Sequence, residues 1–213
     1  MARVLTVNVG HAEPNPYKPV TTTGIGKRPA DGPVAVHDPR GGGSGLAGDH
    51  IGDTGAHGGP DQAVYAFARE DLDRWEARLG RELPNGSFGE NLTTEGLDLA
   101  GVRVGEVWRV GDTVQLQVSA PRIPCATFRG RMGEPGWLKT FTADAHPGAY
   151  LRVLVPGDVR AGDPVAVLRR PDHDVTVALV FRAEMGERDL LPRLAPGRDD
   201  LEPHLRAAVD AAG

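Results

Sequence analysis

The fold of this chain is most readable in the stretch Val102–Ser119, which reads VRVGEVWRVGDTVQLQVS. Valine, leucine and tryptophan dominate it, and glycines interrupt it at positions that suit turns. Short apolar runs bounded by glycine are typical of β-strands. The stretch therefore predicts two strands, 102–110 and 113–119, which a turn at Gly111-Asp112 connects.

The same pattern recurs on both sides of this stretch. Further strands are predicted at residues 4–9, 88–93, 149–155 and 164–168. Many short strands separated by glycine and proline favour a closed or nearly closed barrel, because closure removes unpaired strand edges. We therefore expect a fold that is mainly β with some α, built around a distorted β-barrel.

One long amphipathic helix is predicted between Asp61, which can cap its start, and Gly80, which can end it. Apolar residues recur between them at steps of three and four, a spacing that indicates core packing. Helical spacing near the C-terminus predicts three further short helices. We expect two units, a β-barrel domain at 1–170 and a three-helix extension at 171–213 that is too small for a strong core of its own.

Composition excludes several classes of protein. The chain has 213 residues, a formal net charge of −5, 29 glycines, 18 prolines and one cysteine. The excess of acidic residues and the absence of a basic run argue against a general nucleic-acid binder. No apolar run approaches the roughly 20 residues of a membrane helix, and the first residues lack the apolar core of a signal peptide. We expect a cytoplasmic protein that binds neither membranes nor nucleic-acid polymers.

The single cysteine lies in Pro121-Arg122-Ile123-Pro124-Cys125 and cannot form an internal disulfide. A nearby cation such as Arg122 lowers the pKa of a thiol and favours the thiolate, the form that binds metals. One thiolate can complete the coordination of a metal whose other ligands come from a cofactor. The alternative is that Cys125 is a small buried hydrophobic residue.

A cluster of polar residues precedes the predicted helix. As a zinc site the cluster lacks a convincing second pair of ligands. An anion-binding loop fits better, because Gly58 and Gly59 let the backbone approach a ligand and a helix starting near Asp61 would direct its N–H groups there. A structural role for His57 is the alternative. The cluster consists of Asp49, His50, Asp53 and His57.

Polar side chains in two other segments are further candidates. Lys27 and Arg28 are adjacent cations at a strand end, where at most one can point inward if the strand is extended. Asn91 can both donate and accept hydrogen bonds, as a group that reads a heterocycle must. Thr93 adds a hydroxyl two residues later.

Taken in order, these motifs resemble the MOSC domain, named for the C-terminal domain of molybdenum cofactor sulfurases, and more narrowly its YiiM-like branch. The C-terminal residues are similar to the three-helix extension of that branch, so the resemblance covers nearly the whole chain. Gln62 departs from it, because the pattern has a lysine there. The motifs are Lys27-Arg28-Pro29, Gly48-Asp49, His57-Gly58-Gly59, Asp61–Tyr65, Gly86–Thr93 and Pro121–Cys125.

The resemblance implies a pocket that holds a molybdopterin-type molybdenum cofactor and reduces N-hydroxylated compounds such as hydroxylaminopurines. It implies that Cys125 is the catalytic residue and the metal ligand. The candidate cofactor-binding residues are Lys27, Arg28, His57, Gly58, Gly59, Asn91, Thr93 and Arg122.

The expected substrate is a small N-hydroxylated molecule. A separate electron-donor protein is expected as well, because one cysteine cannot hold an iron–sulfur cluster and no flavin motif is present. The C-terminal helices could support a homodimer. Two alternatives stay open, namely a sulfur carrier that holds a persulfide on Cys125 and a module that binds a pterin or another anion without turnover.

Overall fold

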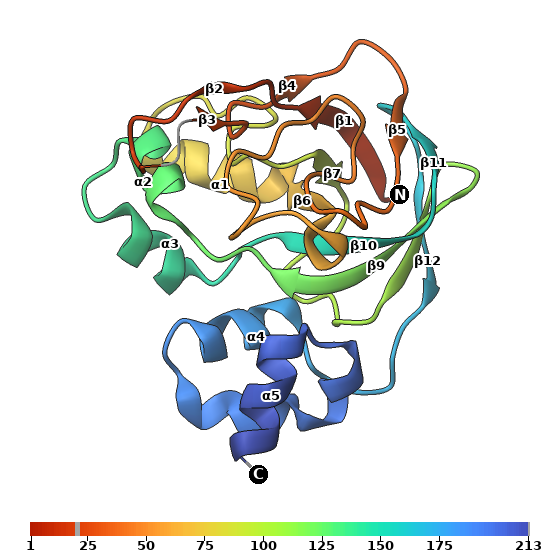
Figure 1. The fold of residues 1–213 in the computed structure, drawn as a ribbon, viewed down its shortest axis with the longest axis vertical. Coiled ribbons are helices and arrows are strands. Elements are labelled where there is room, and N and C mark those ends of the chain that lie inside the picture. The colour runs from red at the N-terminus through yellow and green to blue at the C-terminus, as the bar shows by residue number, and fades with distance from the viewer. Residues whose placement is uncertain (20–21, 213) are drawn as a thin grey trace.

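The computed structural model describes residues 1–19 and 22–212, and its centre is an eight-stranded sheet (Figure 1). The strand order is β12-β8-β9-β10-β6-β7-β1-β4, and the only parallel pair among these described strands is β6 with β7. Two small sheets pair β2 with β3 and β5 with β11. The strands are β1 Arg3–Val9, β2 Glu13–Pro14, β3 Thr22–Thr23, β4 Arg28–Pro29, β5 Val34–Val36, β6 Val64–Ala68, β7 Leu92–Glu95, β8 Val107–Val110, β9 Val114–Pro121, β10 Ala149–Val155, β11 Gly157–Val159 and β12 Val165–Arg169.

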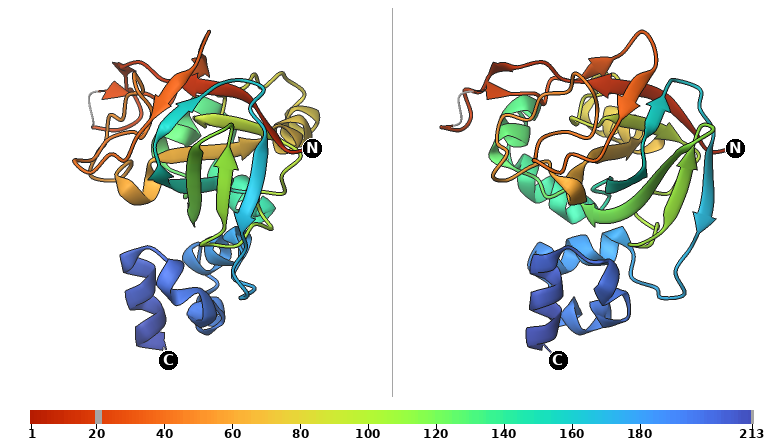
Figure 2. Two further views of the ribbon diagram at one scale, coloured as in Figure 1. Left: turned by 90° about the vertical axis from the view of Figure 1, so that its right-hand side faces the viewer. Right: turned by 45° about the vertical axis from the view of Figure 1, so that its right-hand side comes forward.

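The large sheet curls but does not close, so the prediction of a barrel is wrong (Figure 2). Strand β1 and the residue before β12 meet at a single bridge, between Arg3 and Pro164. The Val4 N–H donates to the carbonyl of Asp163 at 2.9 Å beside this bridge. On the other side of the bridge, the Val165 N–H donates to the carbonyl of Ala2 at 2.9 Å. The result is a mixed α/β fold with one large open sheet.

The prediction of one helix from Asp61 to Gly80 is also wrong in its first half. Pro60–Gln62 is a short 3-10 helix (η1), Val64–Ala68 is strand β6, and only Arg69–Leu79 is helical (α1). All five residues of β6 are buried, because β10 and β7 flank it and both of its faces are covered. A strand buried on both faces is apolar throughout, so it also satisfies a helical spacing. Gly80 ends α1 as expected, with φ 65°.

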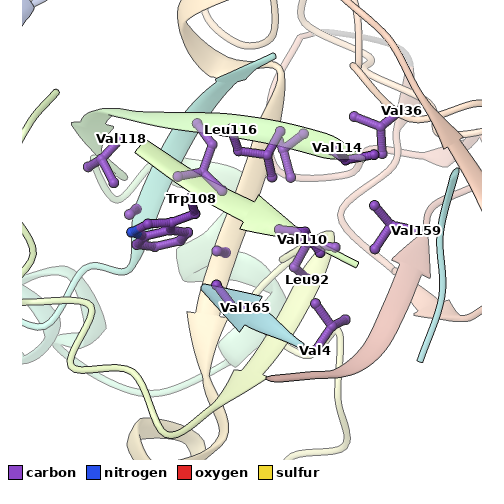
Figure 3. Packing of buried hydrophobic residues seen from close by; sticks show 14 of the residues in the cluster. Val4, Val36, Leu92, Trp108, Val110, Val114, Leu116, Val118, Val159 and Val165 are labelled. Atoms are coloured by element: carbon purple, nitrogen blue, oxygen red, sulfur yellow. The ribbon is translucent and has the colours of Figure 1, made fainter. Parts of the chain in front are cut away.

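Strand β6 contributes to two cores, because successive side chains of a strand point to opposite faces. Val64 and Ala66 belong to the core inside the curled sheet, whereas Tyr65 and Phe67 belong to an aromatic core on the other face. Figure 3 shows valines and leucines of the inner core between the strands, with Trp108 at one side of the cluster. The helices α1, α2 (Ala126–Met132) and α3 (Trp137–Asp144) contribute to the aromatic core, whose rings are Tyr65, Phe67, Trp75, Phe88, Phe128, Trp137, Phe141 and Phe181.

The C-terminal segment packs against one end of the sheet body (Figure 1). It consists of α4 (Val177–Glu184), a 3-10 helix (η2, Arg188–Asp200) and α5 (Pro203–Ala212), at the three places where helices are predicted. The Val177 N–H donates to the carbonyl oxygen of Val102 at 2.9 Å, and this bond anchors the start of α4 to the segment before β8. The domain boundary at residue 170 stays a prediction. None of the helices in residues 1–19 and 22–212 has the length and apolar character needed to span a membrane.

Candidate functional site

A cleft opens on the aromatic side of the sheet, where residues 15–18, 22–25 and 50–57 meet the loop that follows β9. It encloses about 610 Å³ of empty space including its open mouth, a size typical of pockets that hold small molecules. Four of the candidate cofactor-binding and metal-binding residues line it, together with two tyrosines that were not among those candidates. These six residues are Lys27, His57, Tyr65, Arg122, Cys125 and Tyr150.

Cys125 reaches the cleft because the chain turns between β9 and α2. Strand β9 ends at Pro121 and α2 begins at Ala126, so the intervening residues are irregular. Prolines favour extended geometry in the residue before them and remove backbone donors, which prevents the strand from continuing. Cys125 occupies the N-cap position of α2 with extended backbone, φ −120° and ψ 172°, and its side chain is partly buried.

The environment of Cys125 favours its thiolate. Burial raises the pKa of the thiol, but a hydrogen bond with His57, the charge of Arg122 and the backbone N–H of Phe128 together lower that pKa from 9.0 to about 6. Burial raises the pKa of neighbouring Tyr150 to about 12, so its hydroxyl keeps its proton. At neutral pH the cleft therefore presents a thiolate, the form of cysteine that binds metals and attacks electrophiles.

Arg122 is a cation in the wall of this cleft that forms no ion pair with any described residue. Its side chain is 4% exposed, and the guanidinium carbon lies 3.5 Å from the ring centroid of Phe128. Among the described residues, the buried Nη1 atom has no hydrogen-bond partner. A buried arginine normally pairs with an anion or another acceptor. The unpaired donor at the wall of the cleft therefore fits an anionic ligand.

Lys27 also lines the cleft, but its charge is already paired. It forms a buried ion pair with Asp49, and burial lowers the pKa of the amine while the carboxylate opposes that shift. The Asp49 carboxylate also accepts from Ser44 Oγ at 2.6 Å, Gly10 N at 2.7 Å and Asn91 Nδ2 at 2.9 Å. Asp49 therefore acts as a structural centre that holds Lys27 at the edge of the cleft.

The structure places Asn91 and Thr93 outside the lining of the cleft, in a buried polar network. Asn91 Oδ1 accepts from the Tyr65 N–H at 3.1 Å. Thr93 Oγ1 donates to the Glu90 carboxylate at 2.9 Å and accepts from Asn8 Nδ2 at 3.0 Å. These contacts use the hydrogen-bonding groups of both side chains. Asn91 and Thr93 therefore hold β6 and β7 in place and do not face a ligand in the cleft.

Arg28, Gly58 and Gly59 also lie outside the lining of the cleft. Arg28 is exposed on β4, whereas Lys27 before it is buried, as opposite faces of an extended chain require. Gly58 has φ +79°, and a Cβ there would overlap the carbonyl oxygen of Gly43. The Gly59 N–H donates to the same oxygen at 2.9 Å. The two glycines therefore dock another loop, and the long helix predicted to begin behind them starts eight residues after Asp61, at Arg69.

The candidate residues from the sequence did not include Tyr65 or Tyr150, because each lies within an apolar strand where a tyrosine is ordinary core. The two rings pack with their centroids 5.2 Å apart beside Cys125. The zinc interpretation finds no support within residues 1–19 and 22–212, where no three His, Cys, Asp or Glu side chains form a metal-binding group. His50 Nε2 instead lies 3.0 Å from Thr22 Oγ1.

The low pKa of Cys125 predicts alkylation at mildly acidic pH. In protein purified without cofactor, we expect the rate of reaction with iodoacetamide to rise through a midpoint near pH 6, because only the thiolate reacts. His57→Ala should move this midpoint to higher pH by removing the hydrogen bond, whereas His50→Ala should not. Stopped-flow or mass-spectrometric labelling measures both midpoints. An unchanged midpoint in H57A would contradict the conclusion that a hydrogen bond with His57 lowers the pKa of Cys125.

Comparisons with known proteins identify the family of this chain. The MOSC domain model matches residues 53–166. The uncharacterized protein YflK of Bacillus subtilis is 36% identical over 180 residues, 84% of this chain and 79% of YflK. A protein of Gibberella moniliformis named "Reductase" is 32% identical over 172 residues, 79% of this chain but only 29% of that protein. The crystal structure of YiiM from Geobacillus stearothermophilus matches with a TM-score of 0.78 and 27% identity, over 99% of this chain and 98% of that one. This chain therefore belongs to the MOSC domain family and is a YiiM-like member of it.

Proposed function

We propose that this protein is a molybdenum-cofactor-dependent reductase of N-hydroxylated compounds, in which the Cys125 thiolate is the protein's ligand to the metal. The observation that carries the proposal is that the same cleft holds this thiolate and the buried Nη1 of Arg122, which has no hydrogen-bond partner among the described residues. Membership of the MOSC family and the reductase name of one relative support it.

The residues present fit such a cofactor. Molybdopterin carries a phosphate and soft sulfur ligands, so it needs a cation and leaves a coordination position for a protein thiolate. Arg122 Nη1 would supply the cationic donor, and Cys125 would supply the thiolate. Lys27 would add a weaker attraction, because Asp49 already neutralises its charge. When bound, the cofactor supplies two-electron redox chemistry and accepts oxygen from the substrate.

The overall reaction is R–NH–OH plus two electrons and two protons, which yields R–NH₂ and water. The N–O bond breaks, and the electrons come from a separate electron-donor protein. His57 and Tyr150 form the polar wall beside Cys125, where the hydroxyl group of the substrate would lie. The Tyr150 hydroxyl can donate a hydrogen bond to that oxygen, because burial raises its pKa to about 12 and it keeps its proton. His57 would hold the Cys125 thiolate through its hydrogen bond.

Metal analysis tests this proposal directly. Protein produced in a host that makes the cofactor should contain molybdenum stoichiometric with the chain and should reduce a hydroxylamine with an artificial electron donor. Protein without molybdenum from such a host contradicts the proposal. A labile addition of one sulfur atom in the intact mass would instead indicate a sulfur carrier, and retained cofactor without turnover would indicate a binding module.

A further inference from the structure

The segment that contains α2 and α3 carries a local excess of positive charge in an acidic chain. Of the 24 lysines and arginines and 29 acids of the chain, residues 121–144 hold four and two, which leaves 20 and 27 elsewhere. Glu134 lies 3.4 Å from Arg81. Asp144 lies 2.7 Å from Arg74. Because both acids of the segment pair with arginines outside it, its positive charge is available to a partner.

Three of the four cations of this segment are exposed to solvent. Arg129 and Arg131 are exposed on α2, and Lys139 is exposed on α3. The two helices lie side by side, because Phe128 packs against Trp137 with ring centroids 5.4 Å apart (Figure 1). None of the three exposed cations forms an ion pair with a described residue, and none lines the cleft of the thiolate.

An exposed aromatic ring lies between the two arginines of α2. Successive residues of an α-helix are about 100° apart around its axis, so Arg129 and Arg131 flank the face of Gly130. The ring of Tyr17 covers this glycine, since a Cβ on Gly130 would lie 2.1 Å from it, and Tyr17 is 45% exposed. Tyrosine and arginine are enriched where proteins bind one another. Tyr17, Arg129 and Arg131, named the α2 face below, therefore have the character of a docking surface.

The α2 face lies next to the reactive thiolate. Cys125 is the N-cap residue of α2, and the Arg129 N–H donates to its carbonyl oxygen at 2.9 Å. The rise of a helix places Arg129 and Arg131 about 6 to 9 Å from Cys125 along the axis. Asn15, from the loop that supplies the aromatic ring, lines the cleft and donates to Thr127 Oγ1 at 3.1 Å. A protein bound to the α2 face would stand beside Cys125 without entering the cleft.

We propose that the α2 face docks the electron donor, and that this donor is a small protein with an acidic surface around its redox group. The inference rests on the proposed function, because only a redox reaction needs a donor. Opposite charges speed the encounter of two proteins and orient them. In each turnover two reduced carriers give one electron each and solvent gives two protons. The N–O bond of R–NH–OH breaks to yield R–NH₂ and water, and two oxidised carriers leave.

Binding of an acidic carrier tests the α2 face without any turnover. We expect a plant-type ferredoxin to bind the full chain in biolayer interferometry at low salt, and at least about tenfold more weakly at about 0.5 M salt. A double variant, Arg129→Glu with Arg131→Glu, should weaken ferredoxin binding at least about tenfold, because each change replaces an attraction with a repulsion. Tyr17→Ala should also weaken binding but keep its salt dependence, because it removes contact area and no charge.

Arg109→Glu is the matched control for the double variant. Arg109 is an exposed arginine on β8 and does not line the cleft. Its replacement should leave ferredoxin binding unchanged, and an equal loss in this variant overturns the proposal. Absence of ferredoxin binding at low salt also overturns it, as does undiminished binding in the folded double variant. A dimer of this chain that only the double variant dissociates in sedimentation would assign the α2 face to a second copy instead.

Kinetics of the cofactor-loaded protein separate this inference from the proposed function. In the double variant, KM for reduced ferredoxin should rise at least about tenfold. Its molybdenum content and its kcat with saturating reduced viologen, a small donor that needs no docking surface, should match those of the unmodified protein. Absence of molybdenum refutes the proposed function and leaves the binding result standing. Molybdenum and activity with an unchanged KM for ferredoxin refute the docking surface.

Discussion

Cys125→Ala is expected to yield protein without molybdenum and with reductase activity at least about 100-fold lower. The reason is that the structure offers a single soft ligand at this site. Within the described residues no group of three His, Cys, Asp or Glu side chains could replace it. Elemental analysis and a hydroxylamine reduction assay on protein from a cofactor-producing host measure the two effects.

Cys125→Ser tests whether the loss of metal comes from the missing thiolate and not from a change in side-chain size. Serine has nearly the size of cysteine, but its hydroxyl stays protonated at neutral pH and is a hard ligand, so we expect the same loss of metal. Both variants should fold, because Cys125 is only partly buried at the start of α2. Full molybdenum in Cys125→Ala would show that the metal is held elsewhere and would refute the assignment of the thiolate.

Arg122→Gln is expected to cost about 10- to 100-fold in retained cofactor while leaving Cys125 in place. Arg122 carries the charge that the structure leaves unpaired, whereas Lys27 is neutralised by Asp49. The cofactor retained by Arg122→Lys should lie between that of Arg122→Gln and that of the unmodified protein, because lysine keeps the charge but loses the planar fork of donors. Pterin fluorescence after oxidative denaturation, measured beside molybdenum, reports cofactor retention separately from catalysis.

Arg28→Gln is the matched control for this series. Sequence motifs indicate Arg28 as strongly as Arg122, but the structure places its side chain in solvent on β4. Arg28→Gln should therefore retain full pterin. Arg122→Gln should also move the alkylation midpoint of Cys125 above pH 6, because the positive charge of Arg122 lowers the pKa of that thiol. Normal pterin content in Arg122→Gln would contradict the role given to this residue.

Local sequence was enough to predict several features correctly. Strands fall within the stretch 102–119, Gly80 ends a helix, and helices occur at three places after residue 175. Each of these features depends on residues close together in the chain, such as a glycine that adopts a left-handed conformation or an apolar spacing. The Pro-Cys motif also predicts correctly that Cys125 has a low pKa and follows an irregular turn.

Other features depend on neighbours distant in sequence. Residues 64–68 form a strand because β10 and β7 pair with them on both sides, which no local pattern reveals. The sheet stays open because β1 and the segment before β12 meet only at the bridge between Arg3 and Pro164, a contact between residues that are far apart in the chain. Asn91 and Thr93 carry polar groups suited to a ligand, yet contacts with Asp49 and Glu90 already satisfy them.

The sequence by itself determined the family resemblance, several of the strands and helices and the reactive thiol, because these follow from residue types and short spacings. The tertiary structure alone decided which candidates share a cleft, since burial leaves Arg122 unpaired and pairs Lys27 with Asp49. It also decided that Gln62 and Glu202, 140 residues apart, face one cavity. Whether a polar group is available to a ligand depends on which distant atoms fold against it, and that is a property of packing rather than of local sequence.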